Sequence, residues 1–134
     1  MMGQLGMARG DEDYFSLYLA NHAFGGSGFG SRLMHEVREK RGLVYSVYSY
    51  YLPMRQSGPF QIGLQTRNDQ VDEALQIVRT ELEKYIAEGP GENELQDSLK
   101  NITGGFPLRI DSNKKIAEYL SVIGFYNLPL DYLN

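Results

Sequence analysis

An arginine and a tyrosine, Arg38 and Tyr45, have the residue types and the spacing that best suit chemistry in this chain. Ser31 is placed to cap a short helix that runs to about Lys40, and Gly42 is placed to end it. The residues that follow are rich in β-branched and aromatic side chains, which is typical of a strand. We therefore expect Arg38, in the last helical turn, and Tyr45, near the start of the strand, to point at one spot. A guanidinium and a phenol hydroxyl there would donate hydrogen bonds to the same ligand oxygen or backbone, and they are suited to stabilising an oxyanion.

The segment from Gly28 to Tyr51, GFGSRLMHEVREKRGLVYSVYSYY, resembles the signature of the C-terminal-type domain of the pitrilysin/insulinase zinc metallopeptidases, the inverzincins. A looser resemblance extends over most of the chain, through residues 11–26, 58–66, 68–88 and 89–95. In that family, one domain carries an HxxEH zinc motif and a second domain supplies an arginine and tyrosine pair that holds the substrate. Arg38 and Tyr45 fall on the positions of that pair.

The resemblance implies that this chain is the substrate-binding, non-zinc domain of a metalloendopeptidase that hydrolyses peptides. A zinc-bound water, activated by a glutamate of the partner domain, would attack the scissile carbonyl, while Tyr45 donates to the developing oxyanion and Arg38 holds the substrate backbone. The implied partners are a zinc-bearing domain or subunit and a peptide. An alternative from a different class is a non-catalytic assembly or structural relative, like the core subunits of the respiratory cytochrome complex. The retention of both Arg38 and Tyr45 favours the peptidase.

The chain itself lacks the residues of the family's zinc site. It has two histidines, His22 and His35, and neither begins or ends an HxxEH motif. The segment from His35 to Glu39 approaches the HExxH motif of other zinc enzymes, but Glu39 stands where the second histidine of the i, i+4 pair is needed. We therefore expect no metal in these residues and assign the zinc of the complete enzyme to another domain or chain. On this basis, the chain alone should be inactive.

Other features admit an ordinary structural explanation beside a functional one. Tyr48 and Tyr50 are expected in one strand, where they could form an aromatic wall for substrate side chains, although tyrosine is also common in strands. The glycine-rich segment 25–30 fits neither GxGxxG nor GxxxxGK[ST], and we expect a tight turn between helices rather than a nucleotide site. A solvated helical face with i, i+4 pairs is expected for the charged residues Arg32, Glu36, Glu39, Lys40 and Arg41.

Composition indicates one modest soluble domain. The chain has 134 residues, 42% of them hydrophobic and 22% charged, which is ordinary for a globular protein and leaves no room for a second domain. A formal charge of -4 without a basic cluster gives no reason to expect nucleic acid. The absence of cysteine excludes disulfides and fits a bacterial periplasm and a cytoplasm equally. No apolar run approaches the roughly 18 residues that span a bilayer.

The hydrophobic pattern predicts an α+β, two-layer domain, with helices packed on one face of a mainly antiparallel sheet. Helices are expected over residues 11–24, 31–40 and 68–88, from about 95 to 103, and from Ser112 through Ile123. Strands are expected over residues 43–52 and 58–66, joined by a turn at 53–57. The long helix should pack on the sheet through Val71, Leu75, Val78, Leu82 and Ile86.

The last residues, 128–134, are apolar and are expected to begin another helix. We therefore interpret residues 1–134 as a single, C-terminally truncated domain of the resembled family, whose members usually continue with a further helix and a final strand of the sheet. An exposed sheet edge and an apolar patch would then favour self-association.

Overall fold

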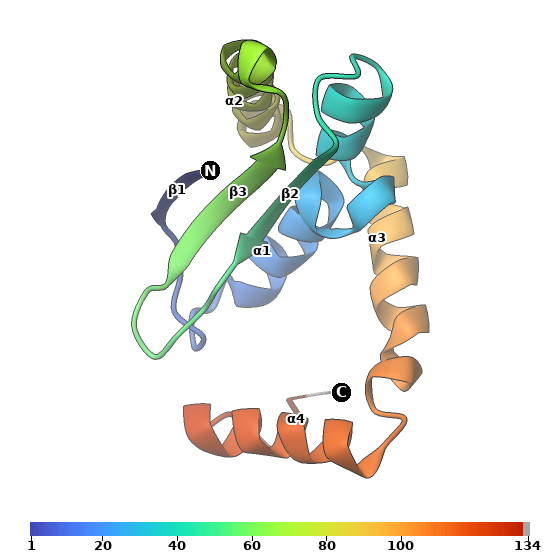
Figure 1. The fold of residues 1–134 in the computed structure, drawn as a ribbon. Coiled ribbons are helices and arrows are strands. Elements are labelled where there is room, and N and C mark those ends of the chain that lie inside the picture. Colours follow the sequence, from blue (N-terminus) through green and yellow to red (C-terminus); the bar gives the residue numbers. More distant parts are fainter. Residues whose placement is uncertain (133–134) are drawn as a thin grey trace.

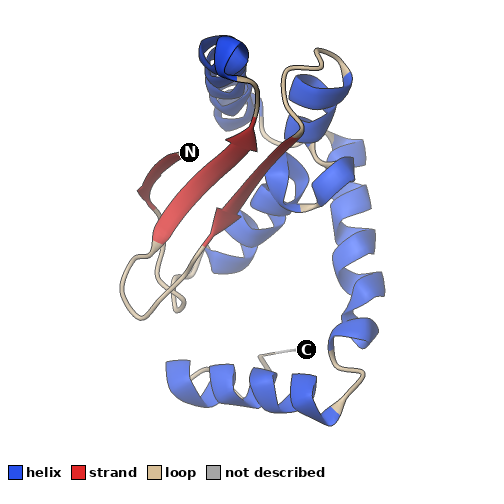
Figure 2. Cartoon of the chain, in the orientation of Figure 1, coloured by secondary structure: helices blue, strands red, loops and turns tan. Residues whose placement is uncertain are grey.

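The computed structural model describes residues 1–132, and within them helices cover one face of a three-stranded antiparallel sheet (Figures 1 and 2). The strands are β1 (Met2–Leu5), β2 (Ser46–Tyr51) and β3 (Pro59–Gln65), in the order β1-β3-β2. The α-helices are α1 (Tyr14–Asn21), α2 (Val71–Glu88), α3 (Glu92–Gly105) and α4 (Asn113–Tyr126). Two π-helical segments, η1 (His22–Gly26) and η3 (Met34–Glu39), and three short 3₁₀ segments, η2 (Gly28–Gly30), η4 (Asn68–Gln70) and η5 (Phe106–Arg109), complete the described elements. The α+β class is confirmed.

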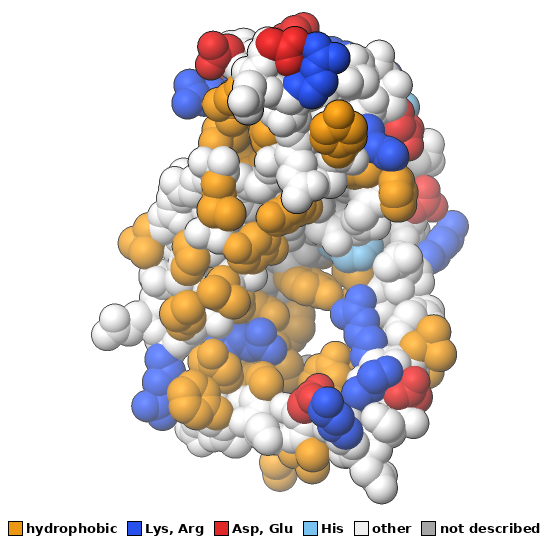
Figure 3. Space-filling model, viewed as in Figure 1, with side chains coloured by type: hydrophobic (Ala, Val, Ile, Leu, Met, Phe, Trp, Pro, Cys, Tyr) orange, Lys and Arg blue, Asp and Glu red, His pale blue; other side chains and the backbone are white. Residues whose placement is uncertain are grey.

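The two faces of the sheet differ because side chains alternate along each strand. Val47 of β2 and Phe60 and Ile62 of β3 are buried in the core. Tyr48 and Tyr50 alternate with Val47 and therefore lie on the other face. Figure 1 shows α1 and α2 behind the sheet, and in the same view hydrophobic side chains lie over the strands on the near face (Figure 3). The helices therefore cover the aliphatic face and leave the tyrosine face open.

The segment η1 approaches β2 closely at a glycine. A Cβ atom at Gly25 would lie 2.3 Å from Ser49 Oγ and 2.7 Å from Ser49 N. Beside this contact, Ser49 Oγ donates to Asn21 Oδ1 at 2.7 Å, and Asn21 Nδ2 donates to the Ser49 carbonyl at 3.2 Å. The backbone of Ser49 cannot rotate away, so the approach of η1 to the sheet requires glycine at position 25.

The expected start of the first strand at Leu43 is wrong by three residues. The backbone N–H of Leu43 closes the preceding helical segment by donating to the Val37 carbonyl at 3.1 Å, and its own carbonyl accepts from Thr66 Oγ1. Leu43 and Val44 are buried in the core, although they precede β2. Their apolar character thus reflects burial and not the pairing of a strand.

The buried face of α2 also differs from the expected stripe. The buried residues of this helix are Ala74, Val78, Glu81 and Tyr85. Val71, Leu75 and Leu82 are only half-buried, and Ile86 is 76% exposed. The small side chain of Ala74 and the partnered polar groups of Glu81 and Tyr85 lie along the centre of the contact, which a hydrophobicity pattern does not detect.

The ends of the chain hold two further differences. The sequence pattern does not predict β1, a four-residue strand whose last three residues are exposed. Residues 128–132 form a turn and irregular backbone instead of the expected helix, and residues 133–134 lie outside the described part of the chain. No helix among residues 1–132 combines the length and the hydrophobicity that a membrane crossing requires.

Adding one methyl group at Gly25 should disturb the contact between η1 and β2. We expect Gly25→Ala to lower the free energy of unfolding by roughly 1–3 kcal/mol, because the Cβ would overlap backbone atoms of Ser49. Gly104→Ala is the matched control, since a Cβ there meets nothing within 4 Å and α3 should gain up to about 1 kcal/mol in helix propensity. Urea unfolding followed by circular dichroism measures both variants, and equal midpoints would contradict the assigned contact.

Candidate functional site

Arg38 and Tyr45 flank the joint between η3 and β2. Arg38 lies in the last turn of η3, and its carbonyl accepts from the backbone N–H of Gly42 at 2.8 Å. Gly42 has a φ of 63°, so it ends the helical segment in a conformation that glycine adopts without strain. Tyr45 lies one residue before β2, and its N–H donates to the Gln65 carbonyl at 2.8 Å. Hydrogen bonds thus fix both ends of the connection that separates the two residues.

Both side chains are accessible to a ligand. Tyr45 is 69% exposed. The guanidinium carbon of Arg38 lies 5.1 Å from the centroid of the Phe29 ring, and the ion pairs within residues 1–132 all involve other cations. An aromatic ring covers a flat face of a guanidinium and leaves its N–H edges available for acceptors. None of the described hydrogen bonds joins Arg38 to Tyr45, and their convergence on one ligand stays a prediction.

Tyr48 and Tyr50 form an aromatic pair on the open face of the sheet. Their ring centroids are 6.1 Å apart with nearly parallel planes, and the Tyr50 hydroxyl donates to Gln61 Oε1. Tyr48 pairs across the strands with Gly63, where a Cβ atom would lie 2.5 Å from the Tyr48 ring. The absence of a side chain at Gly63 therefore allows the Tyr48 ring to lie flat on β3, which sequence reasoning did not identify.

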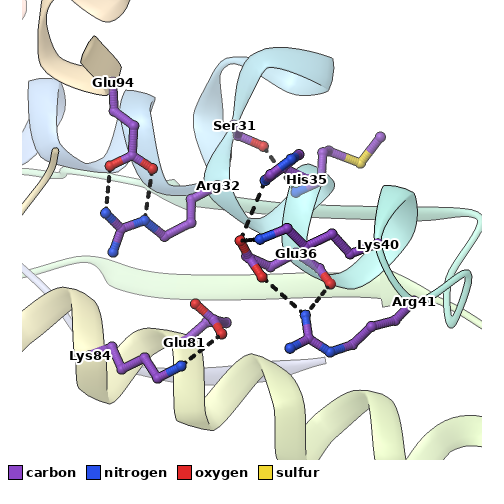
Figure 4. A network of polar contacts seen from close by, with 10 residues as sticks. Ser31, Arg32, His35, Glu36, Lys40, Arg41, Glu81, Lys84 and Glu94 are labelled. Carbon is purple, nitrogen blue, oxygen red and sulfur yellow. Dashed lines mark hydrogen bonds and ion pairs between the residues drawn. The ribbon is translucent and has the colours of Figure 1, made fainter. Parts of the chain in front are cut away.

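Arg32 anchors the segment that carries Arg38 to a distant helix. Its Nε donates to Glu94 Oε1 at 2.8 Å and its Nη2 donates to Glu94 Oε2, as Figure 4 shows. Its guanidinium carbon also lies 4.6 Å from the centroid of the Tyr85 ring. Burial acts to raise the pKa of Glu94, but hydrogen bonds from Arg32 and from the Gly91 N–H keep it below the usual value. The expectation of a solvated helical face is therefore wrong for Arg32, which makes tertiary contacts to α2 and α3.

Tyr85 of α2 joins this contact to the first helix. Its hydroxyl donates to the Ala20 carbonyl at 2.8 Å, and its ring centroid lies 4.9 Å from that of Phe24 in η1. Burial raises the pKa of Tyr85 to about 12, so the hydroxyl remains a donor. Nothing in the sequence pattern marks Tyr85 or the 62-residue separation between Arg32 and Glu94, because these partners meet only in the folded chain.

Glu36 of η3 pairs with neighbouring cations (Figure 4). It pairs with Lys40 at 2.6 Å, with Arg41 at 3.1 Å and with His35 at 3.4 Å. The expected i, i+4 pairing is thus confirmed for Glu36 and Lys40. Partial burial acts to raise the pKa of Glu36, but hydrogen bonds from Lys40 and Arg41 outweigh it and lower the pKa to about 2.

The described residues do not fit a zinc site. No group of three or more histidine, cysteine, aspartate or glutamate side chains in residues 1–132 is arranged to hold a metal ion. His22 is buried in η1, whereas His35 is exposed in η3 beside Glu36. The two histidines lie in different surroundings and do not form a pair.

Residues 1–102 match the family model of the peptidase M16 inactive domain. An uncharacterized zinc protease of Streptomyces coelicolor is 38% identical over 111 residues, which are 83% of this chain and 24% of that protein. A non-peptidase homolog of Helicobacter pylori is 34% identical over 111 residues, which are 80% of this chain and 25% of that protein. The chain thus spans about a quarter of the length of these curated relatives.

Solved structures of similar proteins have the same fold as this chain. The peptidase M16 inactive domain from Pseudomonas fluorescens has a TM-score of 0.91 and 46% identity, over 98% of this chain and 31% of that chain. A protease from Helicobacter pylori has the same fold, with a TM-score of 0.83 at 20% identity over 93% of this chain and 30% of that chain.

The ion pairs of Glu36 with His35, Lys40 and Arg41 should make the free energy of unfolding depend on pH in the acidic range. The pKa of Glu36 is near 4.5 when unpaired and about 2 in the folded chain. Glu36 therefore contributes stability that is fully present above pH 4.5 and lost as the pH falls to about 2. Compared with the unchanged chain, Glu36→Gln should be less stable above pH 4.5, with a difference that vanishes near pH 2. Urea unfolding of both proteins at several values between pH 2 and pH 4.5 tests this difference. Glu83→Gln on α2 is the control, and a pH profile of Glu36→Gln identical to that of the unchanged chain would contradict the assignment.

Proposed function

This chain belongs to the peptidase M16 family, and we propose that it is the substrate-binding, non-zinc domain of a zinc-dependent metalloendopeptidase that hydrolyses peptides. Membership confirms the resemblance to the pitrilysin/insulinase peptidases inferred from residues 28–51. The Streptomyces relative and similar proteins from Bacillus subtilis and Mycobacterium tuberculosis are each named an uncharacterized zinc protease, and these names support the reaction class.

The arrangement of Arg38 and Tyr45 carries the proposal. One is a guanidinium without a described carboxylate partner, and the other is an exposed phenol. They lie at the end of η3 and just before β2, in a segment anchored through Arg32 to α3. The side chains of both residues make no hydrogen bond among residues 1–132. Cationic and hydroxyl donors that are held on a firm support and left free in this way are suited to a substrate.

Each residue has a distinct role in this proposal. The Tyr45 hydroxyl donates a hydrogen bond to the substrate carbonyl oxygen as negative charge develops on it. Arg38 donates from its planar edge to the substrate backbone and holds the peptide in register. Tyr48 and Tyr50, on the open face of the same strand, offer a weaker aromatic contact to substrate side chains.

The zinc implied by the relatives' names would be bound by another domain or a partner subunit. The residues described here do not fit a metal site. The partners in the complete enzyme are therefore a zinc-bearing domain or subunit and a peptide.

A non-catalytic role in assembly is the second candidate. The Helicobacter relative is named a non-peptidase homolog, and the matched family model is that of an inactive domain. In that case Arg38 and Tyr45 would be structural. The two candidates differ in whether the intact protein hydrolyses peptides and in whether these two side chains affect the rate.

Removing the Tyr45 hydroxyl should slow peptide hydrolysis by the complete enzyme, assembled with its zinc-bearing domain. We expect Tyr45→Phe to lower kcat by on the order of 10²–10³, because one donor to the oxyanion is lost while the ring is kept. Arg38→Lys should also be harmful, because an ammonium group cannot reproduce a planar two-point contact. The measurement is hydrolysis of a fluorogenic peptide, with zinc content and thermal melting checked for each variant.

Arg79→Lys on the exposed side of α2 is the matched control and should keep the full rate. If Tyr45→Phe and Arg38→Lys both retained the kcat/KM of the unchanged enzyme, the pair would have no part in catalysis. The assembly role would then become the better explanation.

A further inference from the structure

A polar cavity lies on the side of the molecule away from η3. It has a volume of about 510 Å³, and its walls come from the segment before α1, from α1 and η1, from the second half of β2 and from α3 and η5. Figure 3 shows the molecule hollowed between the sheet and α4, with Lys or Arg side chains and a histidine at the walls of the hollow. None of the residues assigned above to peptide hydrolysis lines this cavity except Tyr50.

Two arginines give this cavity a positive charge without a matching acid. Arg9 and Arg109 both line it, and its lining contains no aspartate or glutamate. Arg9 Nη1 donates to the Tyr14 hydroxyl at 2.8 Å, and Arg109 Nη1 donates to the Tyr18 hydroxyl at 3.0 Å. The ion pairs of residues 1–132 involve neither arginine. Neutral hydroxyls accept from both guanidinium groups, and no described carboxylate lies within ion-pair distance of either.

Two buried nitrogen atoms at this cavity have no hydrogen-bond partner among the described residues. They are Arg9 Nε and His22 Nδ1. His22 is only 7% exposed, and its pKa is lowered, first by burial and further by the charge of Arg109, while the Asn101 side chain acts in the opposite direction. A buried polar atom without a partner costs free energy, and native proteins rarely leave one without a reason. A ligand oxygen in the cavity would supply that reason.

The tyrosine hydroxyls add donors to the same space. Burial raises the pKa of Tyr14 to about 12, so this hydroxyl stays protonated. Its oxygen accepts from Arg9, and the neighbouring Tyr132 hydroxyl also acts to raise its pKa. The Tyr18 hydroxyl is placed in the same way by Arg109. The cavity thus presents two guanidinium groups and tyrosine hydroxyls, and no carboxylate lines it.

An aromatic chamber adjoins this polar cavity. It has a volume of about 850 Å³ and shares Arg9, Tyr14, Tyr18 and Arg109 with its neighbour. The remaining walls are mostly ring or aliphatic side chains, namely Phe15, Ile102, Phe106, Tyr119, Pro129 and Tyr132, with Thr103 and Asp131 as the other polar residues. The two arginines therefore stand at the boundary between a polar space and an aromatic one.

We propose that the joined cavities bind an aromatic carboxylate, with its carboxylate group at Arg9 and Arg109 and its ring in the aromatic chamber. The rings of Tyr14 and Tyr132 lie beside the Arg9 guanidinium, with centroids 4.7 Å and 5.5 Å from its central carbon, and a guanidinium is suited to a carboxylate. A small number of placed polar groups beside a largely apolar wall is the usual form of a small-molecule site. This site goes beyond the proposed function, because it needs neither zinc nor Arg38 and Tyr45.

Two sources share this chemistry: a free aromatic acid and the C-terminal residue of a peptide that ends in phenylalanine or tyrosine. In both, one carboxylate lies a few bonds from one aromatic ring. The two sources differ in the chain attached to the ligand nitrogen, which the experiment varies.

Calorimetric titration of the full chain with N-acetyl-L-phenylalanine tests the proposal. We expect saturable binding of the acid, and binding at least about tenfold weaker for N-acetyl-L-phenylalanine amide, which has the same ring and no charge. Acetate should also bind at least about tenfold more weakly than the aromatic acid, because it leaves the aromatic chamber empty. Equal affinities for the acid and the amide would overturn the proposal, and so would acetate binding as tightly as the aromatic acid.

Variants locate the site. Arg9→Gln and Arg109→Gln should each weaken binding of the acid by about tenfold or more, while Arg79→Gln on α2 should not change it. Thermal melting establishes that each variant is folded, and if one is not, the comparison of acid and amide on the unchanged chain still decides the matter. Binding that survives in both folded cavity variants would overturn the assignment. A tetrapeptide ending in phenylalanine, as free acid and as amide, identifies the source, because only the peptide source predicts that its free acid binds as well as the acetylated amino acid.

Discussion

The contact of Arg32 with Glu94 and Tyr85 is the interaction on which the rest of this domain depends. It connects the start of the segment that carries Arg38 to α3 through a two-point hydrogen bond and to α2 through an aromatic ring. Tyr85 extends the connection to α1 by donating to the Ala20 carbonyl. Because Glu94, Tyr85 and Ala20 belong to α3, α2 and α1, the Arg32 guanidinium and the Tyr85 ring together hold these three helices against one another.

Two π-helical segments connect these helices to the sheet. The wider turns of such segments are uncommon and occur frequently at functional sites. Here η1 brings Gly25 against the backbone of Ser49, and η3 ends with Arg38 shortly before β2 begins. Between them, the glycine-rich turn contributes Phe29, whose ring covers the Arg38 guanidinium. The candidate site is therefore built on elements that are packed on the sheet and are not free loops.

The described ion pairs leave several arginines without a carboxylate partner. The chain has 17 acidic and 13 basic residues, so carboxylates are not scarce. Even so, the described ion pairs belong either to the network of Arg32, Lys40, Arg41 and Lys84 or to three pairs elsewhere on the surface. They do not include Arg9, Arg38 or Arg109. These three arginines instead lie against aromatic rings or hydroxyls. Cations held in this way keep their charge available for a ligand from outside the domain.

The sequence by itself determined the α+β class, the antiparallel pairing of β2 with β3, the helix ends at Gly42 and Gly89 and the family, because these depend on local periodicity, turn residues and a contiguous motif. It also identified Arg38 and Tyr45 as candidates, since they lie within that motif. Only the tertiary structure decided which side of α2 is buried, why Gly25 and Gly63 lack side chains, and how Arg32 reaches Glu94. The same holds for the arginine cavity, whose residues 9, 22 and 109 are far apart in the chain. The physical reason is that such contacts depend on how elements meet in space, which hydrophobic periodicity within one element does not encode.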